Sequence, residues 1–268
     1  MTAPLSSGDG GARRGGPRRV GLIVPSSNVT METEVPELLR RFAAESGGGA
    51  SDDGGPTFTF HSSRAVLHKV DAESLRAMVA ESERCARELA DARVDVVAYA
   101  CLIAIMAEGP GAHESSEARL AATLAAAGCP VPVTSSAGAL VRALERLGAR
   151  RVAVVAPYMK PLTAVVCDYL AGYGVEVVAS VSLEVPDNVE VGRLDPGRLV
   201  GHARSLELKG ADALVLSACV QMPSLAALSA AEEAFGLPVL SAATATAAEV
   251  LSLLGEKPVV EGAGAALR

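Results

Sequence analysis

The chain has 268 residues, half of them hydrophobic, which predicts a globular protein long enough for two compact domains. A net charge of −7, the absence of tryptophan and the lack of a basic stripe argue against nucleic-acid binding. The longest apolar stretch, residues 96–107, has about a dozen residues, whereas a membrane span needs ~20, so a membrane protein is excluded.

The first residues contain no apolar signal-peptide core, and this predicts a cytoplasmic protein. The five cysteines are odd in number and irregularly spaced, which argues against a disulfide framework. No CxxC occurs and the four histidines are scattered, so no metal site is expected.

Beyond residues 1–17, a stretch rich in glycine, serine and arginine that we expect to be disordered, short apolar runs alternate with amphipathic segments. The expected strands lie near 19–24, 57–62, 94–100, 131–134, 152–156, 175–183, 213–217 and 238–241. The expected helices lie near 31–44, 72–91, 115–127, 137–147, 160–172, 196–207, 224–235 and 243–254.

The segment 72–91 shows the helical pattern clearly, because apolar or small residues recur at spacings of three and four. These residues are Leu75, Met78, Val79, Ser82, Cys85, Ala86 and Leu89. Asp71 precedes the pattern and Ser74 lies three residues later, so Asp71 is expected to be the N-cap.

Three short sequences occur twice, in the same order, in the two halves of the chain. The run 95–101 ends in Ala-Cys, as does 212–219; Arg-Arg-Val at 18–20 returns at 150–152; and Pro-Val at 132–133 returns at 238–239. The period, roughly 120–130 residues, is too long for a solenoid and fits two similar α/β domains.

Alternating strands and helices predict two α/β domains with mainly parallel four-stranded sheets. The continuous apolar runs 152–156 and 213–216 fit strands buried on both faces. We expect the first domain at 18–134 and the second at 135–242, with residues from about 243 to 268 packing back on the first. The glycine-rich segment 47–55 is expected to be a surface insertion.

Polar or thiol-bearing residues directly follow several expected strands, where parallel α/β sheets bind their ligands. These are Asn28, Cys101, Ser135 with Ser136, Tyr158 and Cys219. A single buried cysteine is usually a small hydrophobic residue, but two at matching strand ends predict two thiols facing one cleft. Backbone N–H groups in the turns that follow would favour a thiolate and an anionic substrate together.

The remaining candidates have simpler structural interpretations when each is taken alone. Asn28 fits a helix cap as well as an anion site, and Tyr158 fits simple packing. Asn188 follows Pro186 and Asp187 in what looks like a turn. Cys85, Cys129 and Cys167 lack the strand-end position and are expected to be core or surface residues.

Taken together, the motifs closely resemble those of the maleate cis–trans isomerases, within the aspartate/glutamate racemase superfamily. The resemblance runs from about Arg18 to Ala266. It is carried by GLIVPSSNVTMETE at 21–34, FHSSR at 60–64, YACLIAIM at 99–106, SSAGALV at 135–141, VAPYMKPL at 155–162, PDNVEVG at 186–192, SACVQMPSL at 217–225 and SAATAT at 241–246.

This resemblance implies two pseudo-symmetric Rossmann-like domains with the active site between them, and isomerisation of maleate to fumarate without a cofactor. Carried over by motif, Cys101 is the nucleophile and Cys219 the acid/base. The residues implied to hold the substrate are Asn28, Tyr158 and Asn188, with backbone amides near Val220 and Gln221. A small dicarboxylate is thus the expected ligand, and the family implies a homodimer or homotetramer.

Two other interpretations remain open. Two thiols on opposite faces of a Cα–H carbon would also suit an amino-acid or hydantoin racemase, whereas malonate decarboxylation needs only one proton-donating thiol. The third interpretation is a two-domain protein that binds small acids and whose cysteines are incidental. The residues 61–70 and 102–114 each follow a strand end and are the candidates for a loop that covers the substrate.

Overall fold

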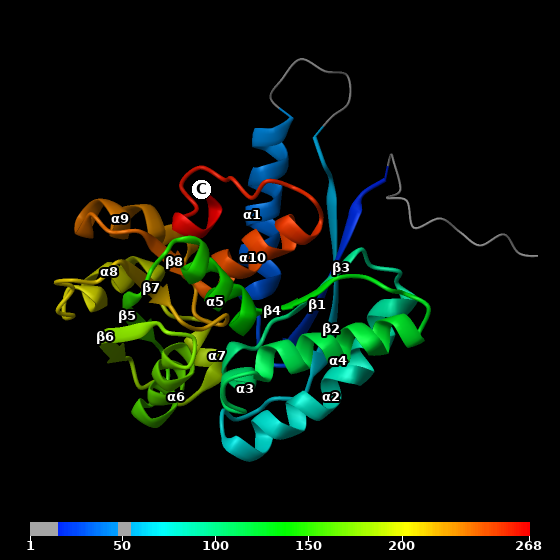
Figure 1. Cartoon of the computed structure of the whole chain (residues 1–268), viewed down its shortest axis with the longest axis horizontal. Coiled ribbons are helices and arrows are strands. Elements are labelled where there is room, and N and C mark those ends of the chain that lie inside the picture. The colour runs from blue at the N-terminus through cyan, green and yellow to red at the C-terminus, as the bar shows by residue number, and fades with distance from the viewer. Residues whose placement is uncertain (1–15, 48–54) are drawn as a thin grey trace, which may run out of the picture.

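The computed structural model describes residues 16–47 and 55–268 and contains two four-stranded sheets (Figure 1). The strand orders are β2-β1-β3-β4 and β6-β5-β7-β8, and every neighbouring pair is parallel. The two orders are equivalent, so the structure confirms the predicted α/β architecture of two similar parallel sheets. Most of the tail 1–17 and of the insertion 47–55 lies outside the described residues.

The first sheet and its helices follow the predicted alternation of strand and helix. In chain order they are β1 (Arg18–Pro25), α1 (Met31–Ser46), β2 (Phe58–Ala65), α2 (Ala72–Asp91), β3 (Val96–Tyr99), α3 (Leu102–Met106), α4 (Ala112–Ala126), β4 (Val133–Ser135) and α5 (Ser136–Arg146).

The second sheet repeats the alternation with shorter helices. Its elements are β5 (Arg151–Ala156), α6 (Lys160–Ala171), β6 (Glu176–Ser182), α7 (Asn188–Val191), η1 (Pro196–Arg198), α8 (Leu199–Ala203), β7 (Ala213–Ser217), η2 (Leu225–Ala227), α9 (Leu228–Phe235), β8 (Val239–Ser241), α10 (Ala242–Leu253) and η3 (Ala265–Leu267).

Burial explains why these segments take the forms that their patterns predicted. The central strands β3 and β7 are buried along their whole length, as continuous apolar runs require in a sheet covered on both faces. Helix α2 buries the predicted apolar stripe against the first sheet. The Asp71 carboxylate accepts a hydrogen bond from the Ser74 N–H at 2.9 Å, which confirms the predicted N-cap.

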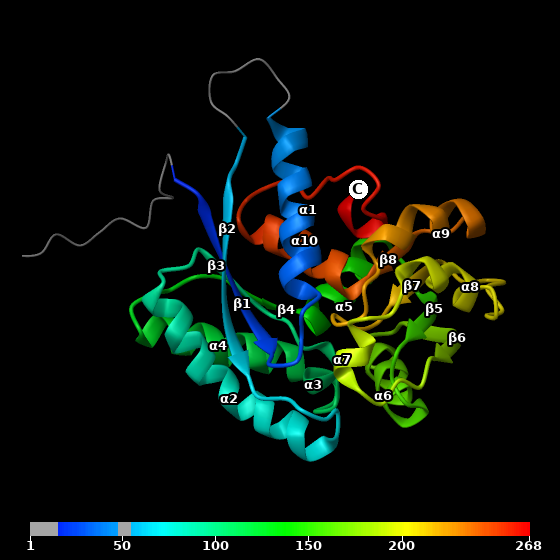
Figure 2. The same cartoon turned by 180° about the vertical axis from the view of Figure 1, so that it is seen from behind.

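The last helix packs away from the sheet that precedes it in the chain (Figures 1 and 2). α10 follows β8 of the second sheet, yet it contacts β3 and β4 of the first sheet and packs along α1 and α5. Helices α2 and α4 also contact the first sheet. The domain limits 18–134 and 135–242 stay a prediction, although the first sheet ends at Ser135 and the second at Ser241.

Four short elements differ from the predicted pattern. The residues after Cys101 form α3, and those after Asp187 form α7, where a simple turn was expected. The Asp187 side chain accepts hydrogen bonds from the N–H groups of Val189 and Glu190 and thereby caps α7. The residue that indicated a turn therefore starts a short helix. The expected helices 196–207 and 224–235 each begin with a short 3₁₀ turn.

A repeated aspartate binds the backbone at the repeated arginine pairs, at the starts of β1 and β5. The Asp95 carboxylate accepts from the Arg19 N–H at 2.7 Å, and that of Asp212 accepts from the N–H groups of Arg150 and Arg151 at 2.8 Å each. Each aspartate therefore joins the start of one central strand to its neighbour. None of the helices in the described parts of the chain has the length and apolarity to cross a membrane.

Candidate active site

A small pocket of about 290 Å³ lies where the carboxyl ends of the two sheets meet. The structure brings all seven predicted site residues together in its wall, although they come from five separate segments. Its lining consists of Pro25, Asn28, Leu67, Val70, Cys101, Leu102, Ile103, Tyr158, Asn188, Cys219, Val220 and Gln221.

Cys101 stands between the end of β3 and the first residue of α3, and its side chain is buried. Burial raises the pKa of its thiol to about 12, the Ala104 N–H opposes that rise by donating to the sulfur, and the negative charge of Cys219 adds to it. Cys101 is therefore a thiol at neutral pH when the pocket holds no substrate.

Cys219 occupies the matching place after β7, and its sulfur has more hydrogen-bond donors. The Gln221 N–H donates to Sγ at 3.4 Å, and the Met222 N–H and the Tyr158 hydroxyl also donate to it. Burial raises the pKa of Cys219, while these three donors act in the opposite direction. The two thiols are thus equivalent by position but differ in how well each would bear a negative charge.

Tyr158 follows β5 and is the one side chain that contributes to this difference. Its hydroxyl is buried beside both sulfurs, so desolvation, together with the charges of Cys219 and Cys101, raises the pKa of Tyr158 well above its ordinary value. The hydroxyl remains protonated and can act as a donor to an anion in the pocket.

Each of the two predicted asparagines uses one hydrogen of its side-chain amide to bind another group of the protein. Asn28 Nδ2 donates to the Val220 carbonyl at 3.3 Å, and its Oδ1 accepts from the Met31 N–H at 3.1 Å. Asn188 Nδ2 donates to Ser27 Oγ at 2.7 Å. A carboxamide nitrogen carries two hydrogens, so each amide keeps one N–H for a ligand.

The Gln221 side chain ties three segments together beneath the pocket. Its Oε1 accepts from the Val29 N–H at 3.0 Å, and its Nε2 donates to the carbonyls of Ser27 and Asn188 at 2.9 Å each. The sequence pointed to the backbone amide of Gln221, whereas the structure gives its side chain a separate role in holding the two domains together.

An apolar wall completes the pocket, and its members carry no signal that distinguishes them from other loop residues. They are Pro25, Leu67, Val70, Leu102 and Ile103. The backbone of Leu67 is held on both sides, because its N–H donates to Ser26 Oγ at 3.0 Å and its carbonyl accepts from Ser27 Oγ at 2.9 Å. Pro25 ends β1, whereas the other four residues fall in the two segments, 61–70 and 102–114, that were expected to cover the substrate.

The other candidates lie outside the pocket. Ser135 caps α5 by accepting from the Gly138 N–H, and Ser136 packs against Thr246. The remaining cysteines also have surroundings unrelated to the pocket: Cys85 is buried on α2, Cys129 directs its thiol to the Val94 carbonyl, and Cys167 is half-buried.

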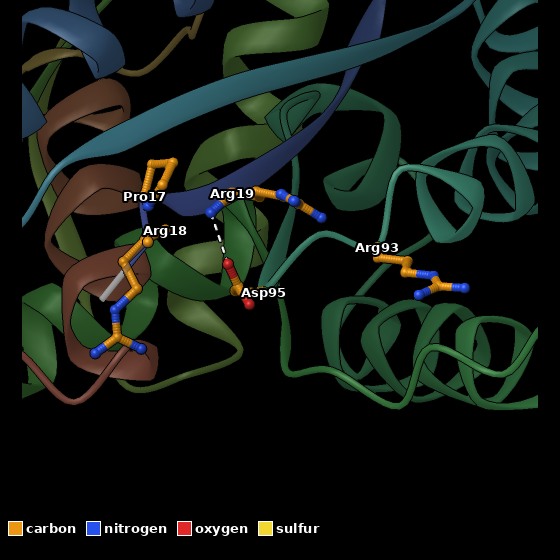
Figure 3. Close-up of a pocket in the computed structure, with 6 residues that line it drawn as sticks. Pro17, Arg18, Arg19, Arg93 and Asp95 are labelled. Carbon is orange, nitrogen blue, oxygen red and sulfur yellow. Dashed lines mark hydrogen bonds between the residues drawn. The ribbon is translucent and has the colours of Figure 1, made fainter. Parts of the chain in front are cut away.

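A second hollow lies at the opposite, amino end of β1 (Figure 3). It is lined by Pro17, Arg18, Arg19, Arg93 and Asp95. In the figure the Arg18 guanidinium points away from those of Arg19 and Arg93, and the only carboxylate among the labelled residues already binds the Arg19 N–H. This hollow therefore offers no convergent set of groups, unlike the pocket with the two thiols.

Comparison with known proteins agrees with this geometry. The maleate isomerase of Geobacillus stearothermophilus is 54% identical over 249 residues, which cover 93% of this chain and 96% of that protein. The chain belongs to the maleate isomerase family. A family model described as Arylmalonate decarboxylase also matches residues 54–267, which places the chain in the wider aspartate/glutamate racemase-like superfamily.

Solved structures of maleate isomerases share the whole fold. The enzyme Iso from Pseudomonas putida S16 superposes with a TM-score of 0.88 at 48% identity, covering 93% of this chain and 98% of that one. The Nocardia farcinica enzyme, as a cysteine-to-serine variant with a covalently bound succinylcysteine intermediate, gives 0.88 at 49% identity, covering 94% and 99%. Arylmalonate decarboxylase, at 22% identity, shares the fold alone.

Proposed function

We propose that this protein converts maleate to fumarate without a cofactor, through a covalent succinylcysteine intermediate. The observation that carries the proposal is the pair of buried thiols, one from each sheet, in a single small pocket that also presents amide and phenol donors. The relatives of about 50% identity that are named maleate isomerase support it.

Cys101 is proposed as the nucleophile and Cys219 as the acid and base. One N–H each from Asn28 and Asn188, with the Tyr158 hydroxyl, would bind the two carboxylates of the substrate. Backbone amides near Val220 and Gln221 would add further donors. Neutral donors suit this task because a buried dianion in an acidic protein needs hydrogen bonds to replace its water.

The reaction requires the carbon–carbon double bond to become single for a time. With one proton lost from the pair of thiols to solvent, the Cys219 thiolate takes the proton of the Cys101 thiol, and the Cys101 sulfur then bonds to one alkene carbon. The π electrons move to the neighbouring carbon and its carboxylate, and Cys219 returns its proton to that carbon. After rotation about the single bond, Cys219 removes the proton, the carbon–sulfur bond breaks and the trans double bond forms.

The different surroundings of the two sulfurs support this assignment of roles. Three donors reach the sulfur of Cys219 and one reaches that of Cys101, so the free enzyme holds its charge better on Cys219. Once the pair has lost one proton, moving the remaining proton from one sulfur to the other leaves the net charge of the pocket unchanged, so the Cys101 nucleophile forms without a further base.

Proton NMR of the thiol-reduced protein with maleate tests the reaction. We expect the vinyl signal of fumarate to grow with the wild-type protein, to be absent with Cys101→Ala and to be unaffected by Cys167→Ala, a matched thiol outside the pocket. Fumarate production by Cys101→Ala would remove Cys101 as the nucleophile. No fumarate from the wild type, with incorporation of solvent deuterium at the Cα of an amino acid, would support a racemase.

Cys219→Ser separates the two proposed roles. In the variant, Cys101 can still exchange its proton with solvent and add slowly to the substrate, but no Cys219 thiolate is present to remove the proton from the adduct carbon, so a maleate adduct should accumulate on Cys101. Intact-mass and peptide-mass spectrometry would detect it. Near-normal turnover with no adduct would remove Cys219 from the mechanism.

We also propose that the protein acts in the cytoplasm as a homodimer or homotetramer. All five cysteines are free, and free thiols persist in a reducing compartment. Light scattering on the purified protein would give the oligomeric state, and fractionation of cells would give the location.

A further inference from the structure

The start of α1, in the first half of the chain, contacts the loop that carries Cys219 at several successive points. The Thr30 hydroxyl donates to the Gln221 carbonyl at 2.6 Å, in addition to the bond from Asn28 to Val220. One turn further along α1, Glu34 reaches the end of the same loop. The first domain therefore holds the loop that follows a strand of the second.

Glu34 binds this loop through both carboxylate oxygens. Its Oε1 accepts from the Ser224 N–H at 2.6 Å and the Leu225 N–H at 2.8 Å, and its Oε2 accepts from the Ser224 hydroxyl at 3.2 Å. These N–H groups begin η2, which leads directly into α9. The carboxylate of one domain thus caps a helical segment of the other.

The chemistry of this contact depends on charge. Glu34 is buried, and it forms no ion pair with any residue that the structure describes. Burial raises the pKa of Glu34, whereas the hydrogen bonds from Ser224 and Leu225 oppose the rise because they favour the ionised form. A charged acceptor makes hydrogen bonds roughly twice as strong as a neutral one, so the ionised form holds the loop most firmly.

The loop is anchored at both of its ends, one end in each domain. At its start, Ser217 at the end of β7 donates to the carbonyls of Cys219 and Met222 at 2.8 and 3.3 Å. At its end, Ser224 is bound by Glu34. Because Cys101 belongs to the first sheet and Cys219 follows the second, the anchor from α1 controls how the second sulfur lies relative to the first.

We propose that Glu34 is a positioning residue for Cys219, which sets the place of that thiol across the domain boundary without touching the substrate. Only the kinetic consequence of this proposal rests on the proposed function. Proton transfer tolerates little displacement of its donor. A less firmly held loop should therefore slow the proton transfers between Cys219 and the substrate carbon more than the addition of the Cys101 sulfur.

Glu34→Gln tests this with little change of shape. Its carbonyl oxygen can still accept from the two N–H groups, but the charge is lost. We expect kcat to fall about tenfold with a smaller change in KM, and a Cys101 adduct to accumulate as in Cys219→Ser. Glu249→Gln is the matched control, because Glu249 is also a buried carboxylate but pairs with Arg142 and Arg146 on another face.

A second measurement does not depend on turnover. With iodoacetamide and peptide mapping, Glu34→Gln should change the alkylation rate of Cys219 several-fold and leave that of Cys101 as in the wild type. Equal changes at both thiols, or the same behaviour in Glu249→Gln, would show a general structural role and overturn the proposal. If the wild type fails to isomerise maleate but the Cys219-specific change occurs, the proposed function fails and the positioning role stands.

Discussion

Adding one methyl group at Gly192 should disturb the contact that ties the two domains together beneath the pocket. Gly192 follows α7 with φ −68° and ψ −12°, a conformation that any residue adopts, so the backbone does not require glycine. The surrounding side chains do require glycine, because a Cβ there would lie 2.7 Å from Gln221 Nε2 and 3.2 Å from Val29 Cγ2. Gly192→Ala must therefore push the Gln221 amide away.

The cost follows from what that amide does. Its nitrogen donates to the carbonyls of Ser27 and Asn188. Two hydrogen bonds weakened at about 0.5–1.5 kcal/mol each, together with about 1–3 kcal/mol for overpacking, predict a loss of about 2–6 kcal/mol in the free energy of unfolding. Because Asn188 shares this contact, kcat/KM for maleate should fall about tenfold.

Urea unfolding and steady-state kinetics would measure both effects, and Gly201→Ala is the control. Gly201 lies within α8, and a Cβ there would meet nothing within 4 Å, so alanine should stabilise the protein by roughly 0.5–1 kcal/mol. Unchanged stability and kcat/KM in Gly192→Ala would refute the view that the Gln221 contact is tightly packed and holds the site.

Two further changes test the environment of the thiols. Tyr158→Phe removes a donor to Cys219, so kcat/KM should fall about 10- to 100-fold and its pH profile should move to higher pH; an unchanged profile would contradict the contact. Because folding raises the pKa of Cys101 from 9.0 to about 12, this thiol contributes stability below pH 9 that is lost as pH rises toward 12. The urea midpoint should therefore fall less between pH 8 and 10.5 in Cys101→Ala than in the wild type, and equal losses would argue against a buried thiol.

Most strands and long helices could be predicted because burial leaves a periodic pattern in the sequence. The continuous run 213–217 and the three-and-four spacing of α2 are examples. The helices α3 and α7 were missed because each is too short for a period to be visible. In α7, the same Asp187 that favours a turn also serves as a helix cap.

The thiols could be predicted because the sequence repeats them at equivalent strand ends. Asn28 and Tyr158 were candidates because they also follow expected strands, whereas Asn188 was a candidate through resemblance alone. The partners of Gln221 and Glu34 could not be predicted. Glu34 binds backbone N–H groups of a segment 190 residues away, and any residue type supplies such groups. Leu67 and Val70 are ordinary loop residues in the sequence, and only the fold places them in the pocket wall.

The packing of α10 on the first sheet affects the order in which the chain can fold. During synthesis β1–β4 leave the ribosome long before α10, whose residues 242–251 are all buried in the finished structure. Until then, the apolar surface that α10 covers has no partner within its own half. The first half therefore completes its core only when the last segment of the chain has been made, and contacts between such distant residues slow folding.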